Sequence, residues 1–391
     1  MGTAAVVGAQ TGYRLCWVAL LVAPLMGTVL AIAAQVGMVA RNDLQSLARK
    51  RYGRRVAGAL LVSVVVVNVV TIAADLQAGA AGIGLLAGVG SRWLVLPLAL
   101  ALTAVLLIGR YGQVVGVLRW VLPGFVAFAV AAVLAHPDWP RLVQGSVAPE
   151  LPLRGSELTG ALALLGTTMT SYVYFWETVQ RGVEEPAGQP PGSHSGGGGR
   201  LARPGLGAVA GAVFTALILW SMLVASAATL GRRHQVVASA QDAAAALRPL
   251  AGPLAGRMFA AGLVVSAVVA LPVLTASTAY AIGAQFDWRR GLSQPVGHAR
   301  RFYAMLAAPI GLAVAVTLAG VPVLGMLVAA SVISGFGTPL GLVILIRLAR
   351  DPQIMGSRPI SRRLATAGWA ATAAIGVVAV LLILRAAGGL S

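Results

Sequence analysis

Residues 56–88 read VAGALLVSVVVVNVVTIAADLQAGAAGIGLLAG, an apolar stretch whose only charged residue is Asp75. A helix needs about 20 apolar residues to cross a hydrocarbon layer about 30 Å thick, so this stretch is long enough to span a bilayer. Similar runs recur along the chain, which is 58% hydrophobic and 10% charged. An ordinary soluble domain contains about 25% charged residues. The sequence therefore predicts an all-α integral membrane protein.

Apolar runs between charged or Gly- and Pro-rich breaks predict about ten membrane-spanning helices in one polytopic domain, residues 1–391. We place them near 16–39, 56–88, 93–109, 118–135, 158–179, 205–230, 256–284, 302–320, 322–346 and 365–384. The sizeable loops are expected at 136–157 and 180–204, and the second has the Gly, Pro and Ser content of a flexible linker. We expect no cleaved signal peptide, because the first run is followed by many more.

The basic residues indicate an orientation in the membrane rather than nucleic-acid binding. The formal net charge is +18, but Lys and Arg lie mainly in the segments between apolar runs. If residues 40–55 are cytoplasmic, 20 Lys and Arg residues lie on that side and nine on the other. Cytoplasmic segments carry such an excess in membrane proteins, so we predict a multi-pass protein of the cell membrane with residues 40–55 in the cytoplasm.

Two of the eleven acidic residues, Asp75 and Glu177, fall inside predicted spans. An ionisable group at membrane depth is costly unless it meets a partner or a wet cavity, so each is a candidate functional residue. Asp75 follows Asn68 and Thr71 at helical spacing, and the three share one face. Asp75 is interpreted either as part of a proton or cation pathway or as a protonated residue that hydrogen-bonds helices together.

A second polar stretch, GTTMTSYVYFWE at residues 166–177, lies within the span predicted at 158–179. Gly166, Thr168 and Ser171, together with the neighbouring threonines, favour a break in the helix because hydroxyl groups compete for backbone hydrogen bonds. Secondary transporters use such broken helices to coordinate ions in mid-membrane. The other interpretation is that these small residues allow close packing of helices.

Other features of the sequence are weaker or argue against enzyme chemistry. Residues 275–278 and 331–339 could line a path, but such segments are more typical of packing or kinks. The four histidines lie in predicted loops and the one cysteine, Cys16, lies in an apolar span, so we expect no thiolate or imidazole metal site in the membrane. Neither paired acids nor a zinc-protease or nucleotide-binding motif occurs, so we expect neither an enzyme nor a bound cofactor.

Five segments together resemble the natural resistance-associated macrophage protein (Nramp) family of divalent metal transporters. They are GAQTGYRLCWVALLVAPLM (8–26), TIAADLQAGAAGI (71–83), LLGTTMTSYVYFWETVQRGVEEP (164–186), LPVLTASTAYAIGAQFDWRRGL (271–292) and SVISGFGTPLGLVILIRLARDPQIMG (331–356). The resemblance covers essentially the full chain. It implies an inverted-repeat fold of the leucine-transporter type, with eleven helices, of which the first and sixth are broken around the metal.

In that fold the ten spans correspond to helices two to eleven. The first repeat then covers 1–135, the loop 136–157 follows, the second repeat covers 158–346, and 365–384 is an extra C-terminal helix. The family carries an Asp-Pro-x-Asn motif in its first helix, and this sequence begins just beyond that motif. We therefore expect the first half-helix and its two metal ligands to be absent.

The resemblance also implies a set of site residues. A gap-free match from Gly166 places Thr170, Ser171 and Tyr172 at the family's Met-Pro-His pattern, so the thioether ligand is absent. Ser331 stands where the family has a glutamine near the metal. The implied metal ligands are Thr167, Thr170, Tyr172 and Ser331. Hydroxyl and carbonyl oxygens suit hard cations such as Mg²⁺, whereas thioether and imidazole ligands favour softer metals.

The implied proton pathway is weaker than in the family. Asp75 matches an acid of the third helix, but a second acid three residues later is Ala78. Glu177 stands where the family has a histidine assigned to proton movement. We hypothesise a secondary transporter of divalent cations, with proton coupling left open and no nucleic-acid partner. The alternatives are an amino-acid or other small-solute transporter of the same fold, or a truncated and transport-inactive membrane protein.

Overall fold

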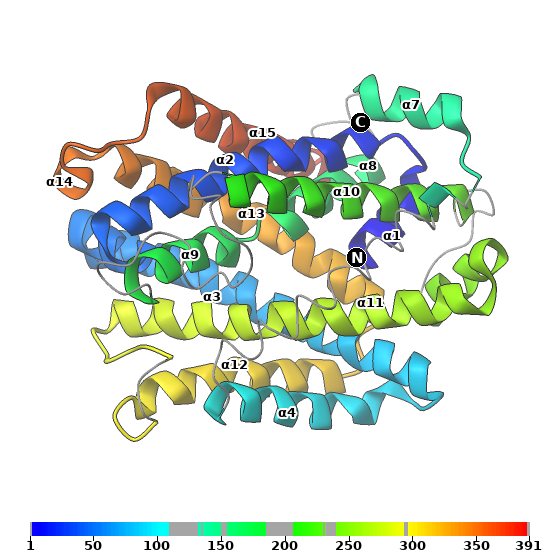
Figure 1. The fold of residues 1–391 in the computed structure, drawn as a ribbon, viewed down its shortest axis with the longest axis horizontal. Coiled ribbons are helices and arrows are strands. Elements are labelled where there is room, and N and C mark those ends of the chain that lie inside the picture. The colour runs from blue at the N-terminus through cyan, green and yellow to red at the C-terminus, as the bar shows by residue number, and fades with distance from the viewer. Residues whose placement is uncertain are drawn as a thin grey trace.

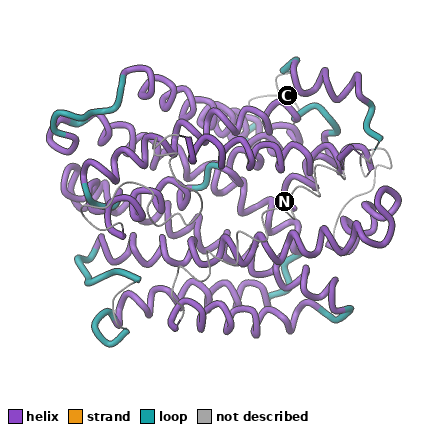
Figure 2. Tube along the Cα trace, viewed as in Figure 1, coloured by secondary structure: helices purple, strands orange, loops and turns teal. Residues whose placement is uncertain are grey.

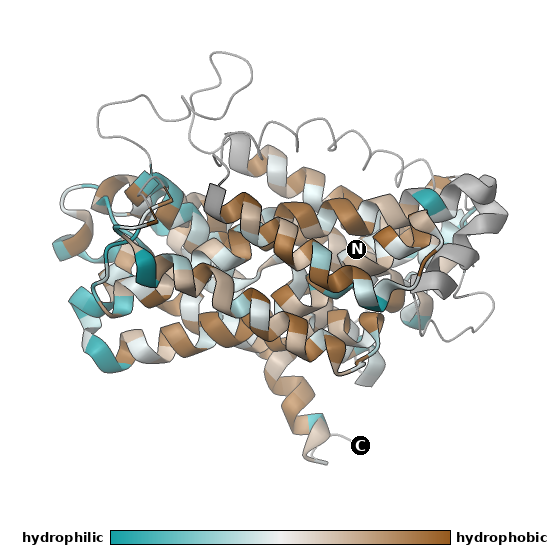
Figure 3. Ribbon diagram, turned by 90° about the horizontal axis from the view of Figure 1, so that it is seen from below, coloured by the Kyte–Doolittle hydropathy of each residue, from teal (hydrophilic) through white to brown (hydrophobic). Residues whose placement is uncertain are grey.

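The computed structural model describes residues 2–108, 132–133, 136–149, 155–184, 206–229, 231, 240–292 and 296–388. Within these residues the protein is helical and contains no strand (Figures 1 and 2). Seven helices in the described part of the chain are long and apolar enough to cross a membrane. Hydrophilic residues gather at the two ends of the bundle and apolar residues fill its middle (Figure 3). The predicted all-α membrane fold is confirmed.

Nine of the ten predicted spans coincide with helices of the structure. The helices are α1 (Gly2–Thr11), α2 (Cys16–Ala40), α3 (Leu44–Ala87), the short η1 (Ser91–Leu94), α4 (Val95–Ile108), α7 (Trp139–Val147), α8 (Gly155–Thr168), α9 (Ser171–Val179), the π turn η3 (Gln180–Glu184), α10 (Leu206–Thr229), α11 (Ala240–Gln285), α12 (Arg300–Leu318), α13 (Val323–Arg350), α14 (Pro352–Met355) and α15 (Arg362–Ala386). The remaining span, predicted at 118–135, lies outside the described residues except for 132 and 133.

Three local predictions differ from the structure. The loop predicted at 136–157 contains helix α7, which Asp138 caps by accepting a hydrogen bond from the Arg141 amide. The segment before residue 16 contains α1, a buried helix too short to be recognised as a span. Of the linker predicted at 180–204, residues 180–184 form the π turn and the rest lies outside the described residues.

Helix α3 changes direction at Gly53, which has φ 82° and ψ 177°. This backbone conformation is open to glycine because it has no Cβ. The kink separates a short basic segment from the long apolar one. The apolar part of α3 packs along α11 and α13, and Figure 1 shows α3 and α11 side by side through the bundle.

Helix α1 packs against α8, α10 and α13, and α8 also packs against α13. Two glycines permit backbone contact there. A Cβ on Gly8 of α1 would lie 2.4 Å from the Leu223 carbonyl oxygen of α10, and one on Gly166 of α8 would lie 1.9 Å from the Ser331 carbonyl oxygen of α13. The small residues of the 166–177 stretch therefore allow close packing as well as a break. The division into two repeats stays a prediction.

Candidate functional site

The span predicted at 158–179 is two helices. Helix α8 ends at Thr168, α9 begins at Ser171, and Met169 and Thr170 between them are not helical. Thr170 is extended, with φ −59° and ψ 148°. The last carbonyls of α8 and the first amides of α9 lack partners within their own helices, as at any helix end. Opposite partial charges of two half-helices thus meet at the break.

Helix α13 holds the break in place. The Thr338 hydroxyl donates a hydrogen bond of 2.8 Å to the Met169 carbonyl oxygen, and the Tyr174 hydroxyl of α9 donates one of 3.4 Å to the Thr338 carbonyl oxygen. The contact of Gly166 with Ser331 fixes the α8 side. Both half-helices are therefore anchored to one continuous helix, which sets the geometry of the break.

A cavity of about 280 Å³ lies beside the break. Oxygen-bearing side chains reach it from seven helices and from the break: Thr3, Thr71, Asp75, Thr167, Thr168, Thr170, Tyr172, Thr215, Ser266, Ser331 and Ser334. Helix α10 adds an apolar wall of Phe214, Ile218, Leu219 and Met222. The structure therefore brings Asp75 and the four sequence-predicted metal ligands to one cavity.

The oxygen groups of this cavity differ in how far their hydrogen-bonding capacity is used. The hydroxyls of Thr71, Thr168 and Ser334 each donate to a carbonyl of their own helix. The Thr170 hydroxyl is buried beside the Tyr172 hydroxyl, but it makes no hydrogen bond of good geometry among the described residues. An unsatisfied buried polar atom costs roughly 1–3 kcal/mol. Thr170, on the cavity wall, is therefore the hydroxyl most in need of a ligand.

Asp75 is half-buried on the wall that α3 contributes. The described residues give its carboxylate neither a hydrogen bond nor an ion pair. Asp75 is the one carboxylate among the described residues that line the cavity. A carboxylate at this depth needs a cation or a proton to balance its charge.

Thr3 of α1 is a cavity residue that sequence reasoning missed. Its hydroxyl forms a hydrogen bond of 3.0 Å with the Ser331 hydroxyl, and Ser331 donates one of 2.7 Å to the Leu327 carbonyl oxygen. Thr3 thereby joins α1 to α13 at the cavity wall. No periodic pattern marks this threonine, because α1 is only ten residues long.

Two residues considered with the site lie elsewhere. Glu177 is on α9, beyond the cavity, and its carboxylate pairs with the Arg181 guanidinium at 3.0 Å. Asn68 is buried against α11, where its amide nitrogen donates to the hydroxyls of Ser277 at 3.0 Å and Thr278 at 2.9 Å. Asn68 therefore joins two helices, whereas Thr71 and Asp75 on the same stretch of α3 reach the cavity.

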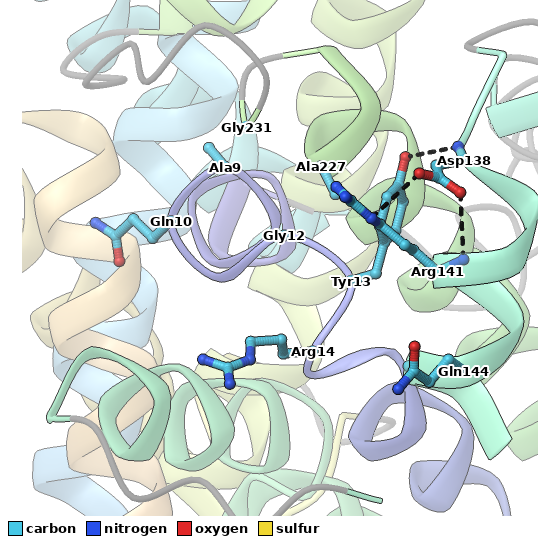
Figure 4. Close-up of a pocket in the computed structure, with 11 residues that line it drawn as sticks. Ala9, Gln10, Gly12, Tyr13, Arg14, Asp138, Arg141, Gln144, Ala227 and Gly231 are labelled. Carbon is cyan, nitrogen blue, oxygen red and sulfur yellow. Dashed lines mark hydrogen bonds and ion pairs between the residues drawn. The ribbon is translucent and has the colours of Figure 1, made fainter. Parts of the chain in front are cut away.

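A second cavity, of about 590 Å³, lies at the turn between α1 and α2 (Figure 4). Figure 4 shows the Tyr13 hydroxyl accepting a hydrogen bond from the Asp138 amide, and Asp138 paired with Arg141 at 3.3 Å. Arg14 pairs with Glu157 at 2.6 Å. The charged residues that line this second cavity are thus paired, and none of the residues predicted to bind metal reaches the cavity.

In the described part of the chain, no group of three or more His, Cys, Asp and Glu side chains could hold a metal ion. Any cation in the cavity beside the break would therefore be held by one carboxylate, hydroxyls and main-chain carbonyls. Such oxygen donors are typical of sites for hard cations.

Comparisons with known proteins show the same fold. The manganese transporter of Eremococcus coleocola, solved with an aromatic bis-isothiourea substituted compound, matches with a TM-score of 0.70 at 16% identity, over 98% of this chain and 82% of that one. A mutant of that transporter matches with a TM-score of 0.68 at the same identity and coverage. A nucleobase-cation-symport-1 family transporter with bound bromovinylhydantoin matches with a TM-score of 0.59 at 12% identity, over 98% and 88%.

At 16% and 12% identity, these structural matches show a shared transporter fold of the leucine-transporter type and no more. The sequence match is more specific, because the family model described as natural resistance-associated macrophage protein-like covers residues 1–385. The chain therefore belongs to the Nramp family of metal ion transporters, which are membrane transporters and not enzymes.

Proposed function

We propose that this protein is a secondary transporter that carries a hard divalent cation, of the Mg²⁺ type, across the cytoplasmic membrane. The observation that carries the proposal is the oxygen-lined cavity at the helix break. Asp75 supplies a negative charge, and Thr167, Thr170, Tyr172 and Ser331 supply hydroxyls. Hard cations prefer oxygen ligands, and half-helix ends add carbonyl oxygens in mid-membrane.

The cavity offers little to a softer metal. The one sulfur among its described lining residues belongs to Met222, which lies in the apolar wall with Ile218 and Leu219 and is 1% exposed. No imidazole or thiolate from the described residues reaches the cavity. Because thioether and imidazole ligands favour transition metals, their scarcity supports a preference for Mg²⁺ over Mn²⁺.

Charge balance supports a role for Asp75 in coupling to protons. A divalent cation beside one carboxylate leaves a net positive charge, and the same carboxylate must be neutralised when the cation leaves. We infer that Asp75 takes up a proton in the unloaded cavity. Glu177 pairs with Arg181 outside the cavity, so a proton carried by Glu177 would move along α9 and not through the cavity at the break.

A second candidate function is transport of a small zwitterion such as an amino acid. The apolar wall formed by Phe214, Ile218 and Leu219 favours this second candidate, because an apolar surface contributes nothing to the binding of a bare cation. The ends of α8 and α9 could bind the charged ends of such a solute, as half-helix ends do in related folds.

The test is uptake by proteoliposomes that contain the purified protein, with Mg²⁺, Mn²⁺, Fe²⁺, Co²⁺ and a radiolabelled amino acid offered separately. We expect Mg²⁺ uptake to exceed that of the softer metals, and Thr170→Ala and Asp75→Asn to abolish it. Thr366→Ala is the matched control, because Thr366 is exposed on α15 and its hydroxyl bonds its own helix.

The outcomes separate the hypotheses. Uptake of the amino acid alone favours the second candidate. No uptake of any solute by a monodisperse, folded protein overturns both and supports the transport-inactive alternative. Mg²⁺ uptake that is indifferent to an imposed pH gradient removes proton coupling and leaves cation transport standing.

A further inference from the structure

The basic end of the bundle contains a cavity that has no part in the proposed transport site. It measures about 420 Å³ and lies between the start of α3 and the end of α11. Its lining residues are Asn42, Ser46, Arg49, Lys50, Ala284, Asp287 and Arg290. This is the end of the bundle that the distribution of Lys and Arg predicts to be cytoplasmic.

Two of the three basic residues of this cavity already have carboxylate partners. Arg49 pairs with Asp287 and donates to the carbonyl oxygens of Ala284 and Gln285, both at 3.0 Å. Arg290 pairs at 2.9 Å with Asp43, which is fully buried.

Lys50 is the exception. It is exposed and has no carboxylate partner among the described residues. Because Asp43 and Asp287 are matched by Arg290 and Arg49, Lys50 leaves the cavity with a net positive charge. The hydrogen bond from Arg49 holds the pKa of the Asp287 carboxyl below its ordinary value, and the charge of nearby Arg54 lowers it further, so Arg54 adds to the positive field.

The neighbouring sequence extends this charge along the membrane edge. Residues 49–55 read RKRYGRR and stand directly before the apolar stretch of α3; Arg49 and Arg51 are matched by Asp287 and Asp351, and the other three basic residues are Lys50, Arg54 and Arg55. The kink at Gly53 separates the first turns of α3 from the membrane-spanning part of that helix. Clusters of four to eight Lys and Arg residues beside a membrane span attract anionic lipid headgroups of the cytoplasmic leaflet.

An aromatic pair next to the cavity points to a lipid rather than a free anion. Phe286 and Trp288 flank Asp287, and their rings stack with centroids 5.5 Å apart. Phe286 is 58% exposed, and the Arg301 guanidinium lies 5.7 Å from the Trp288 ring centroid. Exposed aromatic rings at the end of a membrane bundle are typical of the headgroup level.

We propose that this cavity binds the phosphate group of an anionic phospholipid of the cytoplasmic leaflet. Lys50 is the principal partner of the phosphate, Arg49 and Arg290 shape the cavity, and the Phe286 and Trp288 rings lie at the boundary between headgroup and acyl chains. A lipid held there would bridge the start of α3 and the end of α11. The site is independent of the cavity at the helix break.

The test measures retention of labelled phosphatidylglycerol and of labelled phosphatidylcholine by the purified protein in neutral detergent, with native mass spectrometry as a second readout. We expect the unaltered protein to retain phosphatidylglycerol preferentially. Lys50→Gln should weaken that retention about fivefold, the effect of removing one basic contact near an anionic surface. Lys50→Arg should preserve it.

Arg363→Gln is the matched control, because Arg363 is exposed at the same end of the bundle, lies outside this cavity and gives the same change in charge. We expect it to leave retention unchanged. Equal retention of the two lipids by the unaltered protein overturns the proposal, as does an equal loss in Lys50→Gln and Arg363→Gln, which would indicate diffuse surface charge.

Displacement of the lipid by excess inorganic phosphate would likewise overturn a lipid as the occupant, because the cavity would then bind a free anion. Thermal unfolding of both variants without added lipid must match that of the unaltered protein. A Lys50→Gln variant that has lost its fold is replaced in the comparison by Lys50→Met, which keeps the length of the side chain without its charge.

Discussion

The hydroxyl of Thr338 donates a hydrogen bond of 2.8 Å to the carbonyl oxygen of Met169, the residue at which α8 gives way to the break. The same hydroxyl lies 2.7 Å from the Ser334 carbonyl oxygen of its own helix. A carbonyl left without its helical partner is thus satisfied by a neighbouring helix. The non-helical segment that lines the cavity depends on this contact with α13.

Replacing this hydroxyl should destabilise the protein. Thr338→Val keeps the shape of the side chain and leaves the buried Met169 carbonyl unsatisfied, so we expect the free energy of unfolding to fall by about 1–3 kcal/mol. Thr338→Ser retains the hydroxyl and is the control. Thermal unfolding in detergent measures the difference, and a Thr338→Val protein as stable as the unaltered one would show that the break is held by other contacts.

The approach of α8 to α13 gives a second prediction. A Cβ on Gly166 would lie 1.9 Å from the Ser331 carbonyl oxygen and 2.7 Å from the Gly335 nitrogen, and backbone atoms cannot rotate away. Gly166→Ala should therefore force the helices apart, at a cost of about 1–3 kcal/mol or more, and lower uptake. Gly211→Ala is the control, because no atom lies near its Cβ position. An equal effect of the two substitutions on melting temperature would contradict the packing argument.

Much of the fold could be predicted from the sequence because a bilayer imposes a simple requirement of length and apolarity. That requirement identifies α2, α3, α10 and α13 from their runs alone. Asp75 could be selected because a charged group stands out in an apolar stretch. For the cluster of Gly and hydroxyl residues at 166–171, the sequence left a break and close packing as alternative interpretations, and the structure contains both.

The remaining features depend on contacts between distant segments. Thr3 reaches the cavity only because the short helix α1 is buried against α13, and a ten-residue helix carries no membrane signal. Periodicity places Asn68 on the same face as Asp75, yet two hydroxyls on α11 turn its side chain into a link between helices. Likewise, Arg181 engages Glu177 one helical turn away and outside the cavity.

Asp351 should make stability depend on pH. It caps α14 by accepting a hydrogen bond from the Gln353 amide at 2.9 Å, and its carboxylate pairs with Arg51 of α3. The hydrogen bond from Arg51 holds the pKa of this carboxyl below its ordinary value. A lowered pKa in the folded state means that the pair stabilises the protein above the unfolded pKa of about 3.9, and that this stability is lost as the pH falls through the folded pKa.

Two substitutions separate the charge of Asp351 from its capping role. Asp351→Asn removes the charge and retains a cap acceptor, whereas Asp351→Ala removes both and should cost about 1 kcal/mol more. We expect Asp351→Asn to lower the melting temperature at neutral pH and to approach the unaltered protein as the pH falls below about 4. A deficit that stays constant over that range would show that the ion pair contributes nothing measurable.

Asn68 offers a test that distinguishes a structural role from a transport role on the same helix. The hydroxyls of Ser277 and Thr278 both donate to the Leu274 carbonyl oxygen, at 2.9 Å and 2.8 Å, so each can only accept from residue 68. Asn68→Leu removes the hydrogen bonds and should cost about 0.6–1.7 kcal/mol, the range for a hydrogen bond between membrane helices. Asn68→Asp, when ionised, places an acceptor opposite two acceptors and should destabilise the protein more than Asn68→Leu.

The same substitution tests transport. Because Asn68 does not line the cavity, the folded fraction of Asn68→Leu should transport at the unaltered rate, whereas Asp75→Asn should lose transport and keep its fold. Unfolding in detergent together with uptake per folded molecule measures both quantities, and a loss of uptake in a stable Asn68→Leu protein would place Asn68 on the path of the ion.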